Sequence, residues 1–446
     1  MSSPIVAEIG ENAVKTAKVR TDHHLWGTYI ILVIIAIIEL FSASIQEVND
    51  GDIFRPIVRH GGFILGGLVC MLLIQKLHYR YVYALIPIYV VFSVGLMIAV
   101  RFVGVEMNGA VRAIRIAGIP VLPAEFMKLA AALGMAWILS RNQMKGERDV
   151  TTKGLVYCLL FLFFCAGLLF SQGLSNTIVV MAIGFSMMLV GGMGWKKFGI
   201  ALAITIVVGG CAIGAKTVMS SDKKLTPEQE MVYTLNKERP EEIGGHGRGS
   251  TWMARVKRHF RSDKHLDKFD IDNQQEQLSY IAQAHGGLTG VGIGRSRENA
   301  RLPLAFSDYI YAIIIEEMGL FVGLGILICY LWILGRSAKL TMRFKQTLPG
   351  VLVMGCAFTI VFQALFHMAI VSGVFPVSGQ PLPLISKGGI SVLATSLAYG
   401  VMLSGARHAA RTTDTGIDQR LDAEMLPENA RSENPAMVSV ENEPKE

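Results

Sequence analysis

Long apolar segments recur along the whole chain, and they constrain its fold more than any other feature of the sequence. A helix of about 20 apolar residues crosses the roughly 30 Å of hydrocarbon in a bilayer. Within lipid each segment has to satisfy its own backbone hydrogen bonds, which favours helices. The apolar segments lie near residues 25–45, 57–75, 80–100, 124–140, 154–171, 177–194, 198–215, 306–335, 349–371 and 389–405. The sequence therefore predicts an all-α polytopic membrane protein with about ten transmembrane helices.

The composition supports this prediction and makes some kinds of site improbable. Apolar residues make up 52% of the chain and charged residues only 17%, whereas a soluble protein carries about 25% charged residues. All six cysteines fall inside apolar segments, without a CxxC pair or a Cys/His ligand spacing. We therefore expect neither a disulfide framework nor a zinc site. The first apolar run is long enough to remain as a helix, so no cleavable signal peptide is expected.

The distribution of basic residues predicts the orientation of the chain in the membrane. Every second short loop is basic, with Arg20 before the first helix, Lys76 and Arg80 between the second and third, and Lys196 and Lys197 before the seventh. Basic loops face the cytoplasm, which places both termini there. These anchors also account for much of the net charge of +7, so the charge does not indicate nucleic-acid binding.

Three regions follow from this topology. Residues 1–24 form a cytoplasmic N-terminus, residues 25–410 form the ten-helix membrane domain, and residues 411–446 form a polar cytoplasmic tail that we expect to be disordered. Within the membrane domain, residues 216–305 form a large extracytoplasmic loop before the eighth helix. Its basic stretch, residues 250–265, is compatible with a membrane-surface segment and equally with a solvated charged face.

Carboxylates inside the apolar segments are the clearest candidates for function, because burying an ionised carboxylate costs several kcal/mol unless it has a partner. Asp308 stands at the predicted outer end of the eighth helix. Glu316 lies about 80° further round the same helix and could share a cavity with Asp308, whereas Glu317 points the opposite way. Glu125 has Lys128 three residues later on one helical face. These two and Glu39 are also compatible with purely structural ion pairs.

A glycine-rich stretch precedes these acids. "GGLTGVGIGRS" (286–296) looks like a nucleotide-binding loop, but neither a strand nor a βαβ unit surrounds it. We therefore expect a tight turn that returns the chain to the membrane.

Several motifs, in the same order along the chain, resemble those of the SEDS family, the FtsW/RodA/SpoVE proteins. They are "FSAS" (41–44), "NGAVRAIRIAGIPVLPAEFMKL" (108–129), "ENARLPLAFSDYIYAIIIEEMG" (298–319) and "FPVSGQPLPLISKGGISVLA" (375–394). The resemblance covers about residues 20–410, and the helix count and the long loop before the eighth helix agree with it.

The chain departs from the family motifs at several positions. Leu304 replaces the glutamate of the family's LPE, Ala113 replaces the tryptophan of RW, Leu122 replaces the glutamine of QP, and Lys387 replaces the tyrosine of SYGG. "SQGLSNT" (171–177) also lacks the acid of the family's QPDLGT. No role of the missing LPE glutamate can be transferred to this chain, but Asp308 is retained.

The resemblance implies a peptidoglycan glycan polymerase that uses lipid II, a disaccharide-peptide carried on undecaprenyl pyrophosphate. Asp308 would be the catalytic base that deprotonates the acceptor hydroxyl in a single inverting displacement. The cationic candidates for binding the pyrophosphate are Arg112, Arg115, Lys128, Arg255, Arg297 and Lys387, and the other substrate-binding candidates are Glu125 and Ser378. A divalent cation, Mg or Mn, could assist, although no ligand cluster identifies one.

The loop between the ninth and tenth helices, residues 373–391, is apolar and rich in Pro and Gly. It cannot continue a helix, and irregular backbone at membrane depth has to be buried in protein. We therefore expect it to pack close to Asp308 and to form a wall of the substrate groove, with Ser378 and Lys387 turned towards the substrate.

Two other functions remain open at this stage, a lipid II flippase and an inactive scaffold of the division complex. The resemblance also implies a bacterial inner-membrane protein that works with a class B penicillin-binding protein and other divisome or elongasome membrane proteins. The polar tail favours a division role over an elongation role only slightly.

Overall fold

The structure is a computed structural model of the chain. It describes residues 22–46, 54–107, 110–116, 119–144, 149–170, 172–221, 259, 273–302, 305–344 and 347–414. Three predictions fall wholly or almost wholly outside these residues: the N-terminal region, the tail beyond residue 414 and the basic stretch that contains Arg255.

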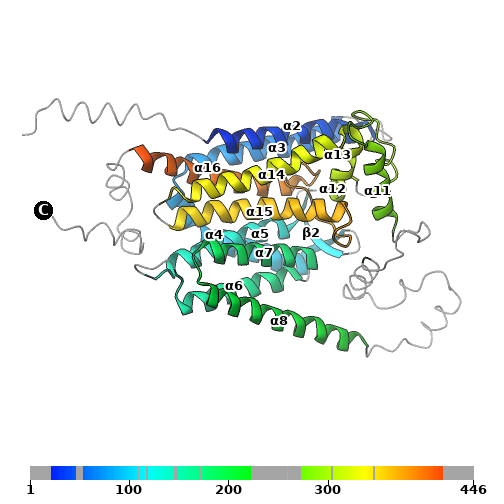
Figure 1. The fold of residues 1–446 in the computed structure, drawn as a ribbon. Helices are drawn as coiled ribbons and strands as arrows, with labels where there is room; N and C mark the ends of the chain where they lie inside the picture. Colours follow the sequence, from blue (N-terminus) through cyan, green and yellow to red (C-terminus); the bar gives the residue numbers. More distant parts are fainter. Residues whose placement is uncertain are drawn as a thin grey trace, which may run out of the picture.

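Ten helices of 17 residues or more lie roughly parallel in one bundle in the described part of the chain (Figure 1). They are α2 (His23–Gln46), α3 (Phe54–Lys76), α4 (Tyr79–Val103), α5 (Pro123–Arg141), α6 (Thr152–Phe170), α7 (Leu174–Val190), α8 (Trp195–Ser221), α14 (Leu320–Thr341), α15 (Thr347–Val371) and α16 (Gly389–Asp414). Seven of the ten are long and apolar enough to cross a membrane, and α7 is a shorter apolar helix. The predicted polytopic helical fold is confirmed.

The bundle has a buried centre and an apolar outer surface. Helix α15 is buried over 89% of its most apolar window and α16 over 83%, whereas α4 is buried over only 22%. The outward side chains of α4 are nevertheless apolar, as shown by Ile88, Val91 and Phe102, which are 66%, 72% and 84% exposed. An exposed apolar surface of this extent is compatible with lipid rather than water, so the chain is a multi-pass membrane protein.

A small antiparallel sheet, which the sequence did not predict, connects α4 to α5. Its strands are β1 (Gly104–Met107), β2 (Ala110–Ile116) and β3 (Ile119–Val121), in the order β1-β2-β3. Figure 1 shows β2 at the same end of the bundle as three short helices, α11 (Gln274–Gly286), α12 (Ala305–Asp308) and α13 (Ile310–Met318). The sheet carries two of the predicted cationic residues to this end.

The predicted eighth helix is broken in two places. A single span over residues 306–335 was expected, but the chain forms α12, α13 and α14, with breaks at Tyr309 and at Gly319, where φ is +87°. The straight-helix geometry that would place Glu316 in a cavity with Asp308 does not hold across the break at Tyr309. The expectation that Glu316 shares a cavity with Asp308 was therefore wrong, because it assumed one continuous helix.

Glu316 and Glu317 instead hold the glycine-rich turn against α13. The Glu317 carboxylate accepts hydrogen bonds from Ser42 Oγ at 2.5 Å and from the backbone N–H of Gly294 at 3.0 Å. Glu316 accepts from the backbone N–H of Arg297 at 3.0 Å and from the hydroxyl of Ser296. These bonds satisfy both buried carboxylates. The prediction of a tight turn is confirmed, because the glycines at 287, 290, 292 and 294 all have positive φ.

Replacing Gly290 with alanine should destabilise the protein. Gly290 has a φ of +82°, and a methyl group there would lie 2.3 Å from the carbonyl oxygen of Glu317. Backbone strain of this kind costs about 1–3 kcal/mol before the clash is counted. We expect a lower midpoint of thermal unfolding in detergent, followed by tryptophan fluorescence.

The matched control is Gly325→Ala in α14, where an added methyl group meets nothing within 4 Å. Alanine is favoured over glycine inside a helix, so this variant should be as stable as the wild type or slightly more stable. Equal midpoints for Gly290→Ala and the wild type would show that the turn is not docked as described.

Candidate functional site

Asp308 is the last residue of α12, a short helix that two consecutive loop residues hold in place. The backbone N–H of Lys387 donates to the carbonyl oxygen of Phe306 at 2.9 Å. The Ser386 hydroxyl donates to the carbonyl oxygen of Ser307 at 2.8 Å. The Ser307 hydroxyl in turn donates to Asp308 Oδ1 at 2.9 Å. The loop therefore fixes the backbone of α12, and Ser307 holds the Asp308 carboxylate.

Gly379 and Arg112 lie next to the Asp308 carboxylate. A methyl group added to Gly379 would lie 2.7 Å from Asp308 Oδ2 and 3.7 Å from Arg112 Nη1. Gly379 does not have positive φ, so what this position requires is space and not a special backbone conformation. The expectation that the 373–391 loop packs close to Asp308 is confirmed. Because Gly379 is exposed and Asp308 is half-buried, the carboxylate lies at an accessible face.

The surroundings of Asp308 alter its acidity. Burial raises the pKa of the Asp308 carboxyl above the ordinary value, while the Ser307 hydroxyl and the nearby Arg112 guanidinium act in the opposite direction. A carboxylate with a raised pKa binds a proton more strongly than an exposed aspartate does. Such a group suits proton abstraction, which requires a pKa closer to the working pH.

Glu125 and Lys128 form a buried ion pair beneath this face. Lys128 Nζ lies 2.8 Å from Glu125 Oε1, and the two side chains are 0% and 6% exposed respectively. Lys128 also donates to Gln380 Oε1 at 3.4 Å. Glu125 Oε2 accepts from Gln363 at 3.2 Å and from Ser391 at 3.3 Å. The predicted pairing on one helical face is confirmed, whereas the assignment of both residues to substrate binding stays a prediction.

The remaining arginines are placed differently from Arg112. Arg112 is half-buried on β2, at the point where the pairing of β2 with β1 shifts register. Arg115 is exposed. Arg297, which directly follows the glycine-rich turn, is exposed as well, and its backbone N–H donates to Glu316. Of the cationic candidates on β2 and in this turn, Arg112 is the one that the structure places beside Asp308.

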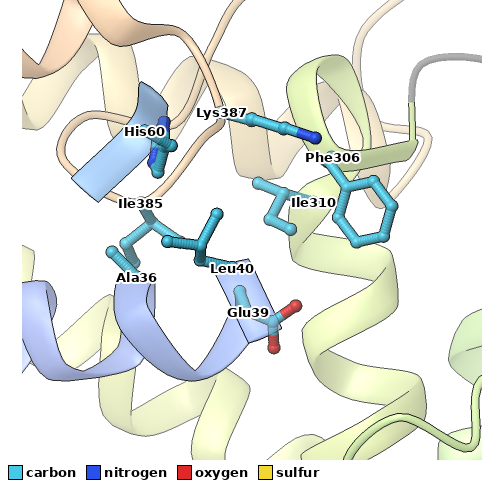
Figure 2. Close-up of a pocket in the computed structure, with 8 residues that line it drawn as sticks. All are labelled: Ala36, Glu39, Leu40, His60, Phe306, Ile310, Ile385 and Lys387. Atoms are coloured by element: carbon cyan, nitrogen blue, oxygen red, sulfur yellow. The ribbon is translucent and has the colours of Figure 1, made fainter. Parts of the chain in front are cut away.

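Lys387 and Ser378 both belong to the loop that packs against α12. Lys387 lines a small cavity with residues of α2 and α3, including Glu39 and His60 (Figure 2). Its ammonium nitrogen lies 5.9 Å from the centre of the Phe306 ring. The Ser378 hydroxyl is hydrogen-bonded to the Ser175 hydroxyl at the start of α7. Contacts of either residue with a substrate remain predictions.

The sequence interpretation missed several polar residues that surround the pair. Gln363 and His367 are four residues apart in α15 and therefore lie on one face of this otherwise apolar helix. Polar residues within membrane segments are uncommon and tend to mark functional regions, so this spacing was a usable signal. Gln380 lies in a loop and Asn176 lies in the first turn of α7. Polar residues are common at such positions, so neither residue stood out in the sequence.

The described residues contain no group of three or more His, Cys, Asp or Glu side chains that could hold a metal ion. A divalent cation held mainly by substrate phosphates needs only one or two protein carboxylates. The possible Mg or Mn ion therefore stays a prediction.

Comparison with known proteins identifies chains of similar sequence. The family model FtsW_RodA_SpoVE, described as "Cell cycle protein", matches residues 22–227 and 252–411. The "Probable peptidoglycan glycosyltransferase FtsW" of Caulobacter vibrioides is 26% identical over 387 residues, covering 86% of this chain and 88% of the relative. The protein of the same name from Idiomarina loihiensis is 28% identical over 390 residues, covering 86% of each chain.

Solved structures share the fold. A chain from a study described as "Structural coordination of polymerization and crosslinking by a peptidoglycan synthase complex" superimposes with a TM-score of 0.59 at 22% identity, covering 87% of this chain and 98% of its own. The rod shape determining protein RodA of Thermus thermophilus superimposes with a TM-score of 0.57 at 19% identity, covering 87% and 97%. At these identities the likeness establishes a common architecture.

Proposed function

The chain belongs to the FtsW/RodA/SpoVE family of cell cycle proteins, and from this premise we propose that it is a peptidoglycan glycosyltransferase that polymerises lipid II. Two relatives that match over most of their length bear the name "Probable peptidoglycan glycosyltransferase FtsW". The observation that carries the proposal is the Asp308 carboxylate, half-buried at an accessible face with Arg112 beside it.

The reaction joins two lipid-linked sugars outside the bilayer. Asp308 accepts the proton of the acceptor's 4-hydroxyl group as the oxygen attacks the anomeric carbon of the donor. The bond between that carbon and the pyrophosphate oxygen breaks, and undecaprenyl pyrophosphate leaves with the electron pair. An α-linked donor that gives a β-linked product requires one inverting displacement, so a single base suffices and no covalent intermediate is needed.

Arg112 supplies positive charge for the leaving group. A guanidinium group offers a planar fork of donors that fits phosphate oxygens. Charge that develops on the pyrophosphate as the bond breaks is stabilised most by a cation that is already in place. The same guanidinium favours the ionised form of Asp308, so it supports the base before the reaction and the leaving group during it.

The proposed setting follows from the family and from the charge pattern. Both termini lie in the cytoplasm, which places the Asp308 end of the bundle on the outer face of a bacterial inner membrane. A class B penicillin-binding protein would crosslink the strands as a partner, in either a divisome or an elongasome. The study from which one structural relative comes concerns a complex that couples polymerisation to crosslinking.

Polymerisation of purified lipid II in detergent tests this function directly. The wild-type protein, alone or with a class B penicillin-binding protein, should produce glycan strands that are resolved by gel electrophoresis. Movement of lipid II across vesicles without polymerisation would support a flippase instead. A folded protein that does neither, but binds its partner, would support a scaffold.

Replacing Asp308 with asparagine should abolish this synthesis. Asparagine has nearly the same shape but cannot take up the proton, and loss of a general base costs about 10²–10⁴ in rate. An unchanged elution profile in size-exclusion chromatography would show that the variant is folded. Activity within threefold of the wild type would rule out Asp308 as the base.

Replacing Gly379 with alanine should also reduce synthesis, by at least about tenfold. The added methyl group would lie 2.7 Å from Asp308 Oδ2, so either the carboxylate or the turn has to move, and a displacement of about 1 Å can cost 10²-fold in rate. Gly388→Ala is the control in the same loop, because its methyl group would make only an ordinary contact of 3.4 Å with Ser391. Equal rates for both variants would contradict the proximity of Gly379 to the reacting groups.

A further inference from the structure

At Gln380 the loop beside Asp308 enters the interior of the protein. Its neighbour Gly379 is exposed, whereas Gln380 is only 3% exposed. Gln380 Nε2 donates to Asn176 Oδ1 of α7 at 2.8 Å, and Gln380 Oε1 accepts from Lys128 Nζ of α5 at 3.4 Å. The carbonyl oxygen of Gln380 accepts from His367 Nδ1 of α15 at 2.6 Å. Three separate helices thus hold this one residue.

The bonds of the adjacent loop residues are consistent with a clamped turn. Pro381 has its carbonyl oxygen bonded by Gln363 Nε2 of α15 at 3.1 Å. On the other side of Gly379, the Ser378 hydroxyl is bonded to Ser175 of α7. Side chains of α7 and α15 therefore hold the loop on both sides of Gly379, the residue that lies against Asp308.

His367 makes a single described hydrogen bond, and that bond goes to the turn. A backbone carbonyl can only accept, so the proton of the imidazole has to be on Nδ1. The other ring nitrogen, Nε2, is buried without a hydrogen-bond partner among the described residues. Burying a polar group with half of its bonding capacity unused costs stability. Among the described residues, the bond to Gln380 is the contact that explains a histidine at this position.

We infer that Gln380 and His367 are positioning residues of the proposed polymerase, which fix the Gly379 turn against Asp308. The buried Glu125–Lys128 pair acts on the reaction through Gln380 and does not need to touch the substrate. If the turn loosens, the alignment of the Asp308 carboxylate with Arg112 is lost. This inference rests on the proposed polymerase activity, and neither residue was identified from the sequence.

Kinetics of lipid II polymerisation separate positioning from a purely structural role. Gln380→Leu and His367→Leu should each lower kcat by at least about tenfold, with KM within threefold of the wild type, because a 1 Å displacement at a reacting group alone can cost 10²-fold. His367→Asn should recover most of kcat, since its amide N–H can replace the Nδ1 donor. Should Gln380→Leu fail to fold, the pair of His367 variants still decides.

Thr359→Val is the matched control. Thr359 also lies in α15 and is 7% exposed, but its hydroxyl donates to the carbonyl oxygen of Gly355 in its own helix, at 2.9 Å, and to no loop residue that the structure describes. This variant should keep the wild-type kcat. The inference is overturned if the Gln380 and His367 variants keep kcat as well, or if His367→Asn is no better than His367→Leu.

A second measurement does not depend on activity. Cysteines placed at Ser175 and Ser378, whose hydroxyls touch in the native turn, should form a disulfide readily under mild oxidation. Adding Gln380→Leu should slow this crosslinking at least about tenfold, whereas adding Thr359→Val should not. If the wild type fails to polymerise lipid II, the proposed function is wrong, and crosslinking still shows whether Gln380 holds the turn. Equal crosslinking rates in all three backgrounds would overturn the inference.

Discussion

Burying a carboxylate costs free energy unless it has a partner, and the partners of three such groups, Glu125, Glu317 and Asp308, organise the functional end of this bundle. Glu125 is neutralised by Lys128 and hydrogen-bonded in the interior. Glu317 is satisfied by a hydroxyl of α2 and a backbone N–H of the glycine-rich turn. Asp308 differs from both, because it keeps an accessible face next to Arg112. Glu125 and Glu317 therefore stabilise the structure around the site, whereas the Asp308 carboxylate remains accessible to a substrate.

One loop connects this support to the site. Residues 378–381 are held by α5, α7 and α15, and residues 386–387 are bonded to the backbone of α12. The position of Asp308 thus depends on helices that are far apart in the sequence but packed together in the bundle. A rigid scaffold of this kind is needed to keep a base aligned with two large substrates, because a loose carboxylate would lose most of its rate advantage.

The sequence predicted the features that depend on local composition. The lengths of the apolar segments predicted the transmembrane helices. The Pro- and Gly-rich loop was correctly expected to lie against Asp308. The sheet that carries Arg112 was missed, because its strands are short and their pairing is not visible in composition. The break at Tyr309 was missed because the apolar run continues through it. Bonds of Gln380 to three helices depend on packing between segments up to about 250 residues apart, which a single sequence does not reveal.

The central claim is that Asp308 is a half-buried base whose ionised form Arg112 supports. The pH dependence of kcat for lipid II polymerisation tests this claim most directly. The base works only when ionised, so kcat should fall as the pH drops through its pKa. Because burial raises the pKa of Asp308, this fall should occur above the value of about 3.9 for an exposed aspartate. Arg112→Gln removes the charge that lowers this pKa, so its fall in kcat should occur at a higher pH than in the wild type. The account would be contradicted if kcat fell at the pKa of an exposed aspartate. It would also be contradicted if kcat fell at the same pH in Arg112→Gln as in the wild type.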